Sequence, residues 1–192
     1  MNFIGQSDIV SDLSVMLERK EFVHALFVGP AGIGKTKLVL GLVEESGRKL
    51  LRLSGPFLQD IGDILSVLFH LSDDCIVFID EIHAMSLECE EILYQAMDEF
   101  RISASFSGEF VTRRLRPFTL LAATTAKHKL SQALVSRFCY SAYLSPYSVD
   151  ELVMIGALHQ CQFHDISALE ELAKRSRGIP RRIIQLVRWC EL

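Results

Sequence analysis

Short apolar runs alternate along this chain with longer amphipathic stretches, and the two patterns predict strands and helices respectively. The run Cys75–Ile79 is almost wholly apolar. Such a run is typical of a strand that is buried on both faces of a parallel sheet. Similar short runs predict four further strands, over Val23–Val28, Leu50–Leu53, Phe118–Ala122 and Cys139–Leu144.

The amphipathic stretches between these runs carry apolar residues at helical spacing. They predict helices over Gln6–Lys20, Lys35–Ser46, Ile61–His70 and Glu88–Phe100, and Gly47 is placed to end the second of them. Strands separated by helices indicate a three-layer α/β fold around a five-stranded parallel sheet.

After Pro146 the pattern changes to helices alone, and we expect three of them between about Ser148 and Trp189. Pro180 stands where a first helical turn tolerates proline. Two pairs have the spacing of a capping box, Ser148 with Glu151 and Ser167 with Glu170. We therefore predict a large α/β domain over residues 1–146 and a small all-α domain over 147–192.

Net charge, cysteine spacing and the lengths of the apolar runs exclude several classes of protein. The net charge of −4 argues against a large non-specific electrostatic grip on nucleic acid. The five cysteines are scattered and never form a C-x-x-C pair, which favours reduced thiols in a cytoplasmic protein over a disulfide framework or a zinc site. The N-terminal residues do not have the pattern of a signal peptide, and no apolar run is long enough to span a bilayer.

The segment Gly29–Thr36 reads Gly-Pro-Ala-Gly-Ile-Gly-Lys-Thr and fits the phosphate-binding pattern G-x-x-x-x-G-K-[ST]. Its glycines allow successive backbone N–H groups to turn toward an anion, and the helix that follows points its positive end at the same place. Lys35 would supply a cation for the β- and γ-phosphates, and the Thr36 hydroxyl would bind Mg²⁺. The candidate nucleotide contacts here are Gly29, Pro30, Ala31, Gly32, Ile33, Gly34, Lys35, Thr36 and Lys37.

Two carboxylates, Asp80 and Glu81, follow directly after the buried strand Cys75–Ile79. Open α/β sheets bind ligands at the carboxyl ends of their strands. Asp80 would hold Mg²⁺ directly or through water, and Glu81 would orient and deprotonate the attacking water. Together with the phosphate loop, this pair predicts an enzyme that binds and hydrolyses ATP with Mg²⁺.

Two other features are ambiguous by themselves. The pair Thr124–Thr125 ends a predicted strand, where β-branched residues are usually structural. Arg137 lies between two apolar runs, and the residues alone favour an ordinary surface arginine there.

With these motifs in place, the chain resembles the AAA+ ATPases and, among them, the RuvB family of Holliday-junction branch-migration motors. The resemblance is collinear over essentially the whole chain. It is carried by Phe3-Ile-Gly-Gln6, the phosphate loop, Ser54-Gly-Pro56, Phe78-Ile-Asp-Glu-Ile-His83, Glu91-Ile-Leu-Tyr94 to Phe100, Pro117-Phe-Thr-Leu120, Ala123-Thr-Thr125, Ser136-Arg-Phe138, Pro146-Tyr147 and Arg175–Arg181.

The resemblance implies roles that spacing cannot give. It makes Thr125 the residue that senses the γ-phosphate, Arg137 an arginine finger that reaches a neighbouring subunit's site, and Arg181 a second sensor beside Pro180. It also implies adenine contacts from Tyr147, Phe3 and Ile4, and an interface with the adjacent subunit through Asp98, Glu99, Phe100 and Arg137. A finger supplied in trans requires an oligomer, and the family implies a hexameric ring around DNA.

Several positions depart from the family's pattern. Ala126 and Val135 replace arginines, and Lys37 replaces a threonine. The sequence also ends where the family's C-terminal winged-helix domain would begin, and it has almost none of the family's N-terminal arm. These departures put autonomous DNA binding in question.

The insert Ile102–Arg116 matches a β-hairpin that grips the family's junction-binding partner, RuvA, and Gly108–Glu109 could form its turn. The candidate partner contacts are Phe106, Phe110, Arg113 and Arg114, and Arg116 adds a further cation. A strand edge protected by charge is an equally good interpretation.

Three functions remain open from the sequence. The first is a motor that drives branch migration or translocates duplex DNA. The second is an ATPase that remodels or assembles a protein partner. The third is a regulatory subunit that scarcely hydrolyses ATP, against which the complete set Lys35, Asp80, Glu81, Arg137 and Arg181 argues.

Overall fold

The computed structural model describes residues 3–18, 23–106, 109–159 and 166–190, and for 104–106 and 109–111 it describes the backbone alone. Its centre is a five-stranded parallel sheet with the strand order β2-β3-β6-β1-β7. The strands are β1 (Ala25–Val28), β2 (Lys49–Ser54), β3 (Cys75–Asp80), β6 (Phe118–Thr124) and β7 (Tyr140–Tyr143). The five-stranded parallel sheet predicted from the apolar runs is confirmed.

Burial along each strand follows its place in the sheet. The central strand β6 is buried at every position, and β3 is buried up to its last residue, Asp80. The edge strands β2 and β7 are partly exposed. Side chains alternate between the two faces, so that Val77 and Ile79 join one core cluster while Ile76 and Phe78 join the other.

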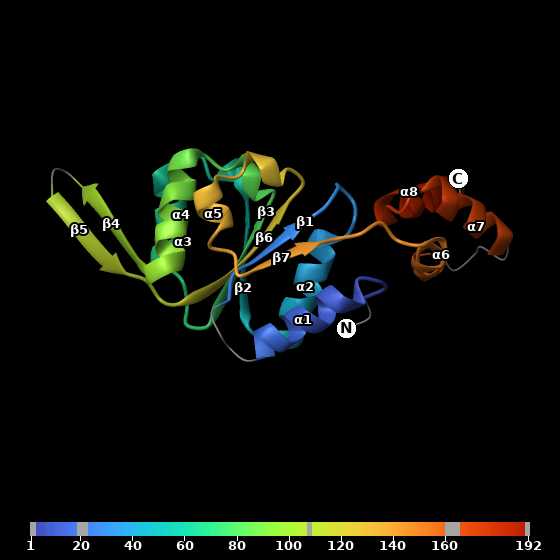
Figure 1. Ribbon diagram of the computed structural model, residues 1–192, viewed down its shortest axis with the longest axis horizontal. Helices are drawn as coiled ribbons and strands as arrows, with labels where there is room; N and C mark the ends of the chain where they lie inside the picture. Colours follow the sequence, from blue (N-terminus) through green and yellow to red (C-terminus); the bar gives the residue numbers. More distant parts are fainter. Residues whose placement is uncertain (1–2, 19–22, 107–108, 160–165, 191–192) are drawn as a thin grey trace.

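Helices cover both faces of the sheet and make the three layers (Figure 1). On one face lie α1 (Ser7–Glu18) and α2 (Lys35–Ser46), which pack against each other. On the other face lie α3 (Ile61–Phe69), α4 (Leu87–Glu99) and the short α5 (Gln132–Val135). Gly47 ends α2 with a left-handed φ of 65°, as its position in the sequence predicts.

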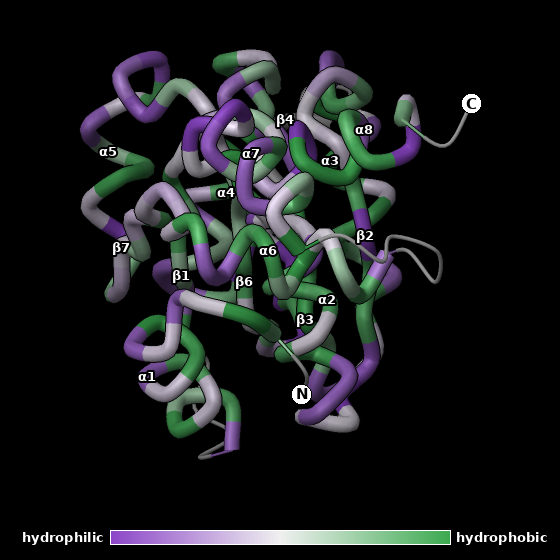
Figure 2. Tube along the Cα trace, turned by 90° about the vertical axis from the view of Figure 1, so that its right-hand side faces the viewer, coloured by the Kyte–Doolittle hydropathy of each residue, from purple (hydrophilic) through white to green (hydrophobic). Residues whose placement is uncertain are grey.

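In the described residues after β7, the structure has three helices: α6 (Val149–Leu158), α7 (Ile166–Arg175) and α8 (Pro180–Cys190). They pack on one another at one end of the molecule, and Figure 2 looks at them from that end, with the strands behind. The capping box of Ser148 with Glu151 is present, whereas Ser167 lies inside α7, so the second predicted cap is wrong. Leu152 and Ile183 join the core cluster that covers α2, which ties these helices to the sheet.

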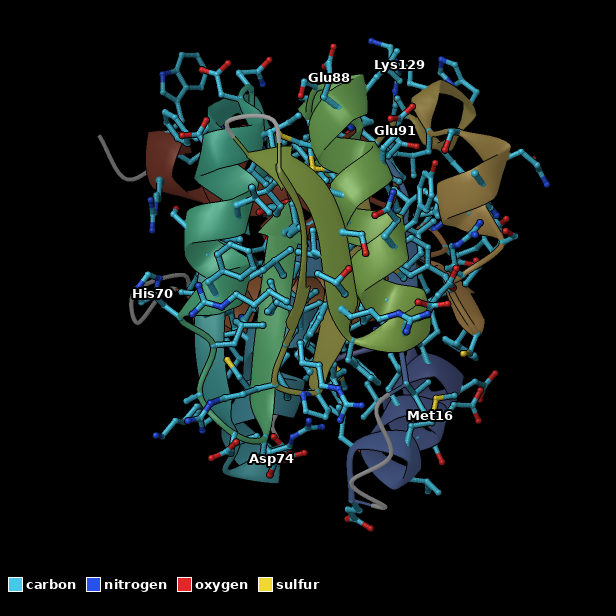
Figure 3. All side chains as sticks on the ribbon, turned by 90° about the vertical axis from the view of Figure 1, so that its left-hand side faces the viewer. Met16, His70, Asp74, Glu88, Glu91 and Lys129 are labelled. Atoms are coloured by element: carbon cyan, nitrogen blue, oxygen red, sulfur yellow. The ribbon has the colours of Figure 1, made fainter. Side chains whose placement is uncertain are left out.

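The insert forms the predicted hairpin, from β4 (Arg101–Phe106) and β5 (Glu109–Arg114), and makes a second, antiparallel sheet. It projects from the body at the end opposite α6–α8 (Figure 1), and Figure 3 shows it in front of α3 and α4. Gly108, half of the predicted turn, lies outside the described residues. None of the described helices is long and apolar enough to cross a membrane.

Candidate functional site

The phosphate loop joins β1 to α2 at the carboxyl edge of the sheet. Its first residue is fixed to the neighbouring strand, since the Gly29 N–H donates to the Thr124 carbonyl at 3.3 Å. Gly32 and Gly34 have φ values of 81° and 109°, which L side chains rarely adopt. A Cβ at Gly32 would lie 2.8 Å from the Arg181 Cβ, so the loop also needs glycine there for close approach to α8. Ile33 is fully buried in the core, so its side chain takes no part in the site.

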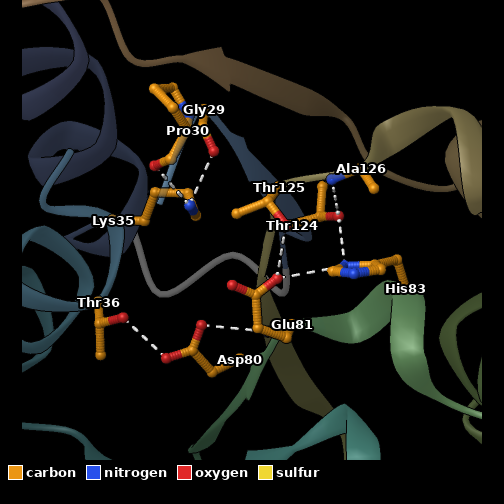
Figure 4. Close-up of polar contacts among 10 residues, drawn as sticks. All are labelled: Gly29, Pro30, Lys35, Thr36, Asp80, Glu81, His83, Thr124, Thr125 and Ala126. Carbon is orange, nitrogen blue, oxygen red and sulfur yellow. Dashed lines mark hydrogen bonds and ion pairs between the residues drawn. The ribbon is translucent and has the colours of Figure 1, made fainter. Parts of the chain in front are cut away.

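Lys35 begins α2 and is itself buried. Its Nζ donates to the carbonyl oxygens of Gly29 (2.8 Å) and Pro30 (3.1 Å), which folds the side chain over the loop (Figure 4). Burial lowers the pKa of Lys35 from its usual value, and the negative charges of Glu81 and Asp80 oppose that shift. The loop therefore holds a cation at its centre, with two carboxylates close enough to act on it.

The next residue, Thr36, connects the loop to the end of β3. Its Oγ1 donates to Asp80 Oδ2 at 2.7 Å, while Asp80 Oδ1 accepts from the Glu81 N–H at 3.1 Å. A hydroxyl and a carboxylate oxygen in contact are the hard donors that Mg²⁺ prefers, and Mg²⁺ commonly takes its other ligands from water and phosphate. The described residues contain no group of three or more His, Cys, Asp or Glu that could hold a metal alone. This donor pair therefore fits a magnesium ion that is shared with a bound phosphate.

Glu81 stands immediately beyond β3 and points toward the end of β6 (Figure 4). Its Oε2 accepts from Thr125 Oγ1 at 3.0 Å and lies 3.2 Å from His83 Nδ1. The same His83 nitrogen is 3.0 Å from Thr124 Oγ1. The structure thus brings the two predicted residues Glu81 and Thr125 together, and adds His83, for which the sequence predicted no role.

A cavity of about 530 Å³ opens between the phosphate loop and α8. Arg181 is fixed beside it, because its backbone N–H donates to the Gly32 carbonyl at 3.2 Å. Part of the wall of this cavity was not predicted from the sequence. Gln185 and Arg188 line it together with Ile184, and they follow Arg181 at helical spacing, a signal that could have found them. The other lining residues are Ala31, Gly32, Gly34, Lys35, Thr36, Lys37, Asp80, Glu81 and Pro180.

A second, small cavity of about 60 Å³ adjoins the loop and is mostly apolar. Phe3, Ile4 and Tyr147, the three predicted base contacts, line it together. Burial raises the pKa of Tyr147 to about 12, and the Glu151 carboxylate adds to that rise. Gly34, Lys37, Pro180 and Ile184 line both this cavity and the larger one, so the two adjoin along one wall.

Arg137 lies away from both cavities, just after α5. Its Nε donates to Asp98 Oδ2 at 2.9 Å, its Nη1 donates to the Ala133 carbonyl at 2.5 Å, and its guanidinium stacks 4.6 Å from the centre of the Tyr94 ring. Asp98 and Arg137 thus form one cluster on the surface of α4 and α5. Of the other two predicted interface residues, Glu99 pairs with Arg101, and Phe100 packs edge-on against Phe118.

Two arginines of the insert make contacts within the chain. The Arg113 guanidinium lies 4.4 Å from the centre of the Phe69 ring on α3, and Arg116 pairs with Asp73. Arg114 is exposed and stands opposite Arg101 in the strand register. The side chains of Phe106 and Phe110 are outside the described ones, although their backbones form part of β4 and β5.

A family model described as the Holliday junction DNA helicase RuvB P-loop domain matches residues 1–144. The chain belongs to the RuvB family. It is 40% identical over 199 residues to the Holliday junction branch migration complex subunit RuvB of Chlamydia pneumoniae, and 38% identical over 199 residues to that of Tropheryma whipplei (strain TW08/27). Both alignments cover 97% of this chain, but they cover 59% and 57% of those relatives.

Solved RuvB structures agree with the fold. A mutant of Thermotoga maritima RuvB superposes with a TM-score of 0.86 at 36% identity, over 97% of this chain and 62% of that one. The structure described as the Thermotoga maritima RuvB Holliday junction branch migration motor gives a TM-score of 0.82 at 36% identity, over 97% of this chain and 61% of that one. The predicted RuvB resemblance and α/β fold are therefore confirmed, and this chain spans somewhat more than half the length of the RuvB proteins that it matches.

Proposed function

We propose that this chain is a Mg²⁺-dependent ATPase subunit of a motor that acts on Holliday junctions, as the names of its RuvB relatives state for those proteins. The observation that carries the proposal is the contact of 2.7 Å between Thr36 Oγ1 and Asp80 Oδ2 beside the Lys35 ammonium. It joins a phosphate-binding loop to a carboxylate at the wall of a cavity of about 530 Å³. ATP would supply the phosphoryl group that is cleaved there.

Within this site each residue takes one task. Lys35 leaves the carbonyls of Gly29 and Pro30 and binds phosphate oxygens, with the loop N–H groups around it. Thr36 and Asp80 hold Mg²⁺. Glu81 orients the attacking water and accepts its proton, and Thr125 senses the γ-phosphate from beside Glu81. This assignment rests on the family's motifs and on the distances among these side chains.

Helix α8 supplies the other wall of the larger cavity, and α6 and α8 both line the small one. We propose that residues 147–192 form a separate small domain that closes on the nucleotide. Arg181 would reach the phosphates from α8, while Phe3, Ile4 and Tyr147 would hold the adenine. The base cavity of about 60 Å³ is far smaller than usual ligand pockets, so its walls would have to move to admit a base.

Arg137 completes the site of a neighbouring subunit in this proposal. It belongs to the cluster on α4 and α5 and not to the wall of its own chain's cavity, as a finger supplied in trans requires. The subunits would therefore assemble into a ring, with Asp98, Glu99, Phe100 and Arg137 at the contact. The hairpin of β4 and β5 projects from the body and is the surface that we propose for a RuvA-type partner.

The test is ATP hydrolysis by the purified full chain, alone and with linear duplex DNA, four-way junction DNA, or a junction with a RuvA-type protein. The proposal expects Mg²⁺-dependent turnover that is lost in Glu81→Gln and rises with the junction and partner together. Absence of turnover under every condition would refute the ATPase. Turnover that a protein partner stimulates equally with and without DNA would instead favour an ATPase that remodels protein.

A further inference from the structure

His83 occupies a position in the site that the proposed function does not use. It lies in the short 3-10 turn η2 (Ile82–Ala84) that directly follows Glu81, and its side chain is 15% exposed. One ring nitrogen, Nδ1, is 3.2 Å from Glu81 Oε2 and 3.0 Å from Thr124 Oγ1. A single nitrogen thus faces both a carboxylate and a hydroxyl (Figure 4).

The placement of hydrogen atoms decides what these two contacts mean. An ionised carboxylate can only accept a hydrogen bond. If Thr124 donated its hydroxyl proton to Nδ1, a nitrogen lone pair would face the Glu81 oxygen and repel it. If Nδ1 carries the proton, it donates toward both oxygens, and neither contact is repulsive. The geometry therefore favours the tautomer of His83 that is protonated on Nδ1.

Thr124 connects this arrangement to the phosphate loop. Its hydroxyl accepts from the Ala126 N–H at 3.0 Å, and its side chain is fully buried. Its carbonyl accepts from the N–H of Gly29, the first residue of the loop, at 3.3 Å. A short chain of hydrogen bonds therefore runs from the start of the loop, through Thr124, to His83 and Glu81.

Glu81 needs such support because it has freedom to move. Its side chain is 38% exposed, and a Glu side chain has several rotatable bonds. Thr125 Oγ1 donates to Oε2 at 3.0 Å from one side, and His83 Nδ1 approaches the same oxygen at 3.2 Å from another. Two donors from two different elements fix the oxygen more narrowly than either of them alone.

We propose that His83 is a positioning residue for Glu81, and that its Nδ1–H holds the carboxylate beside Thr125 and couples it through Thr124 to the phosphate loop. The inference rests on the proposed function in one respect, since it takes Glu81 as the base of ATP hydrolysis. His83 itself does not line the cavity, although it contacts Glu81, which does. In this proposal it does not contact the nucleotide. Its effect on catalysis would pass entirely through Glu81.

The kinetic test uses three variants of the full chain. His83→Ala should lower kcat about tenfold, with the KM for ATP changed less than about twofold, because ligand-supporting residues typically act on this scale. His83→Asn should recover most of the loss, because the asparagine amide can place an N–H near the position of Nδ1. His70→Ala is the matched control, since the exposed His70 also bonds through Nδ1, to the Ser66 carbonyl at 2.7 Å, and should leave kcat unchanged. An unaltered kcat in His83→Ala, or no recovery in His83→Asn, would overturn the proposal.

A second measurement does not depend on hydrolysis. Nitrogen NMR of the histidine rings should show His83 protonated on Nδ1 in the unmodified chain. In Glu81→Ala it should shift to the tautomer protonated on Nε2, because Nδ1 is then free to accept from Thr124. Protonation on Nε2 in the unmodified chain would refute the inference. A chain without ATPase activity would refute the proposed function, and the tautomer would still decide whether His83 holds Glu81.

Discussion

The backbone of Gly55 lies directly against the backbone of Glu81. A Cβ added at Gly55 would come within 2.2 Å of the Glu81 carbonyl oxygen and 3.0 Å of its carbonyl carbon. Glu81 itself has a φ of 49° and a ψ of 48°, a left-handed conformation that costs energy for a residue with a side chain. The turn after β2 therefore packs closely against Glu81, the proposed base, whose backbone is strained.

Substituting Gly55 by alanine should consequently displace Glu81 and not merely fill space. We expect Gly55→Ala to lower ATP turnover by about a hundredfold, since misplacement of a catalytic group by about 1 Å can cost that much. Gly62→Ala is the control, because a Cβ at Gly62 in α3 meets nothing within 4 Å. Turnover and thermal unfolding of both variants provide the measurement. Normal turnover in Gly55→Ala would show that the close contact does not position Glu81.

Substitutions at Lys35 and at Glu81 should have different effects on ATP binding and on ATP hydrolysis. Removing the cation in Lys35→Ala should weaken ATP binding by about ten- to a hundredfold, the usual worth of a hydrogen bond to a charged group. Glu81→Gln should bind ATP normally and lower hydrolysis by about two to four orders of magnitude, because the base is lost while the phosphate contacts stay. Titration with a fluorescent ATP analogue, beside turnover, distinguishes the two. Equal loss of binding in both variants would contradict the assigned roles.

Arg137 should affect hydrolysis without affecting binding. In Arg137→Ala we expect nucleotide affinity within a few-fold of normal and turnover lowered by about a thousandfold, the scale on which arginine fingers act. Arg175→Ala is a suitable control, since Arg175 is exposed and pairs with Glu171 four residues earlier in α7. If Arg137→Ala lost affinity as much as turnover, the arginine would act within its own subunit's site.

The lowered pKa of His24 predicts how the free energy of unfolding changes with pH. Burial is the main reason why its pKa falls from 6.5 to about 4, and its Nδ1 accepts from the Leu120 N–H at 2.9 Å, which requires the neutral ring. Between these two pKa values the unfolded chain binds the proton and the folded chain does not. The contribution of His24 to the free energy of unfolding should therefore be fully present above about pH 6.5. The free energy of unfolding should fall by about 3 kcal/mol as the pH drops to about 4.

The check is thermal unfolding between pH 7 and pH 4. His24→Asn should flatten this dependence, because an asparagine oxygen can accept from Leu120 without titrating. His70→Ala should retain the same pH dependence of thermal unfolding as the unmodified chain. An unchanged pH dependence in His24→Asn would show that another group causes it.

Local patterns predicted the sheet and the phosphate loop because both depend on residues close in sequence. The buried run Cys75–Ile79 ends at Asp80 and Glu81, and the glycines of the loop stand between a strand and a helix, so the sequence alone places them at the same edge. The hairpin was also predicted, from the resemblance, as an insert between α4 and β6. Its projection from the body follows from its pairing with itself and not with the main sheet.

Other features arise only from contacts between distant segments. The role of His83 depends on Thr124, which is 41 residues away, and a lone histidine beside an acidic pair gave no signal of that contact. The stacking of Arg137 on Tyr94 and its pairing with Asp98 likewise depend on how α4 and α5 pack together. Ser167 was misplaced because its spacing to Glu170 fits a capping box, while α7 already includes it.

The central claim is that one subunit's Glu81 and a neighbour's Arg137 act on the same ATP molecule. Mixing two inactive variants, Glu81→Gln and Arg137→Ala, tests it most directly. In a mixed assembly some sites combine an intact Glu81 from one subunit with an intact Arg137 from the next, so ATP turnover should reappear well above that of either variant alone. If the mixture stays as inactive as its components while nucleotide-dependent assembly is intact, the site is not shared, and the account is contradicted.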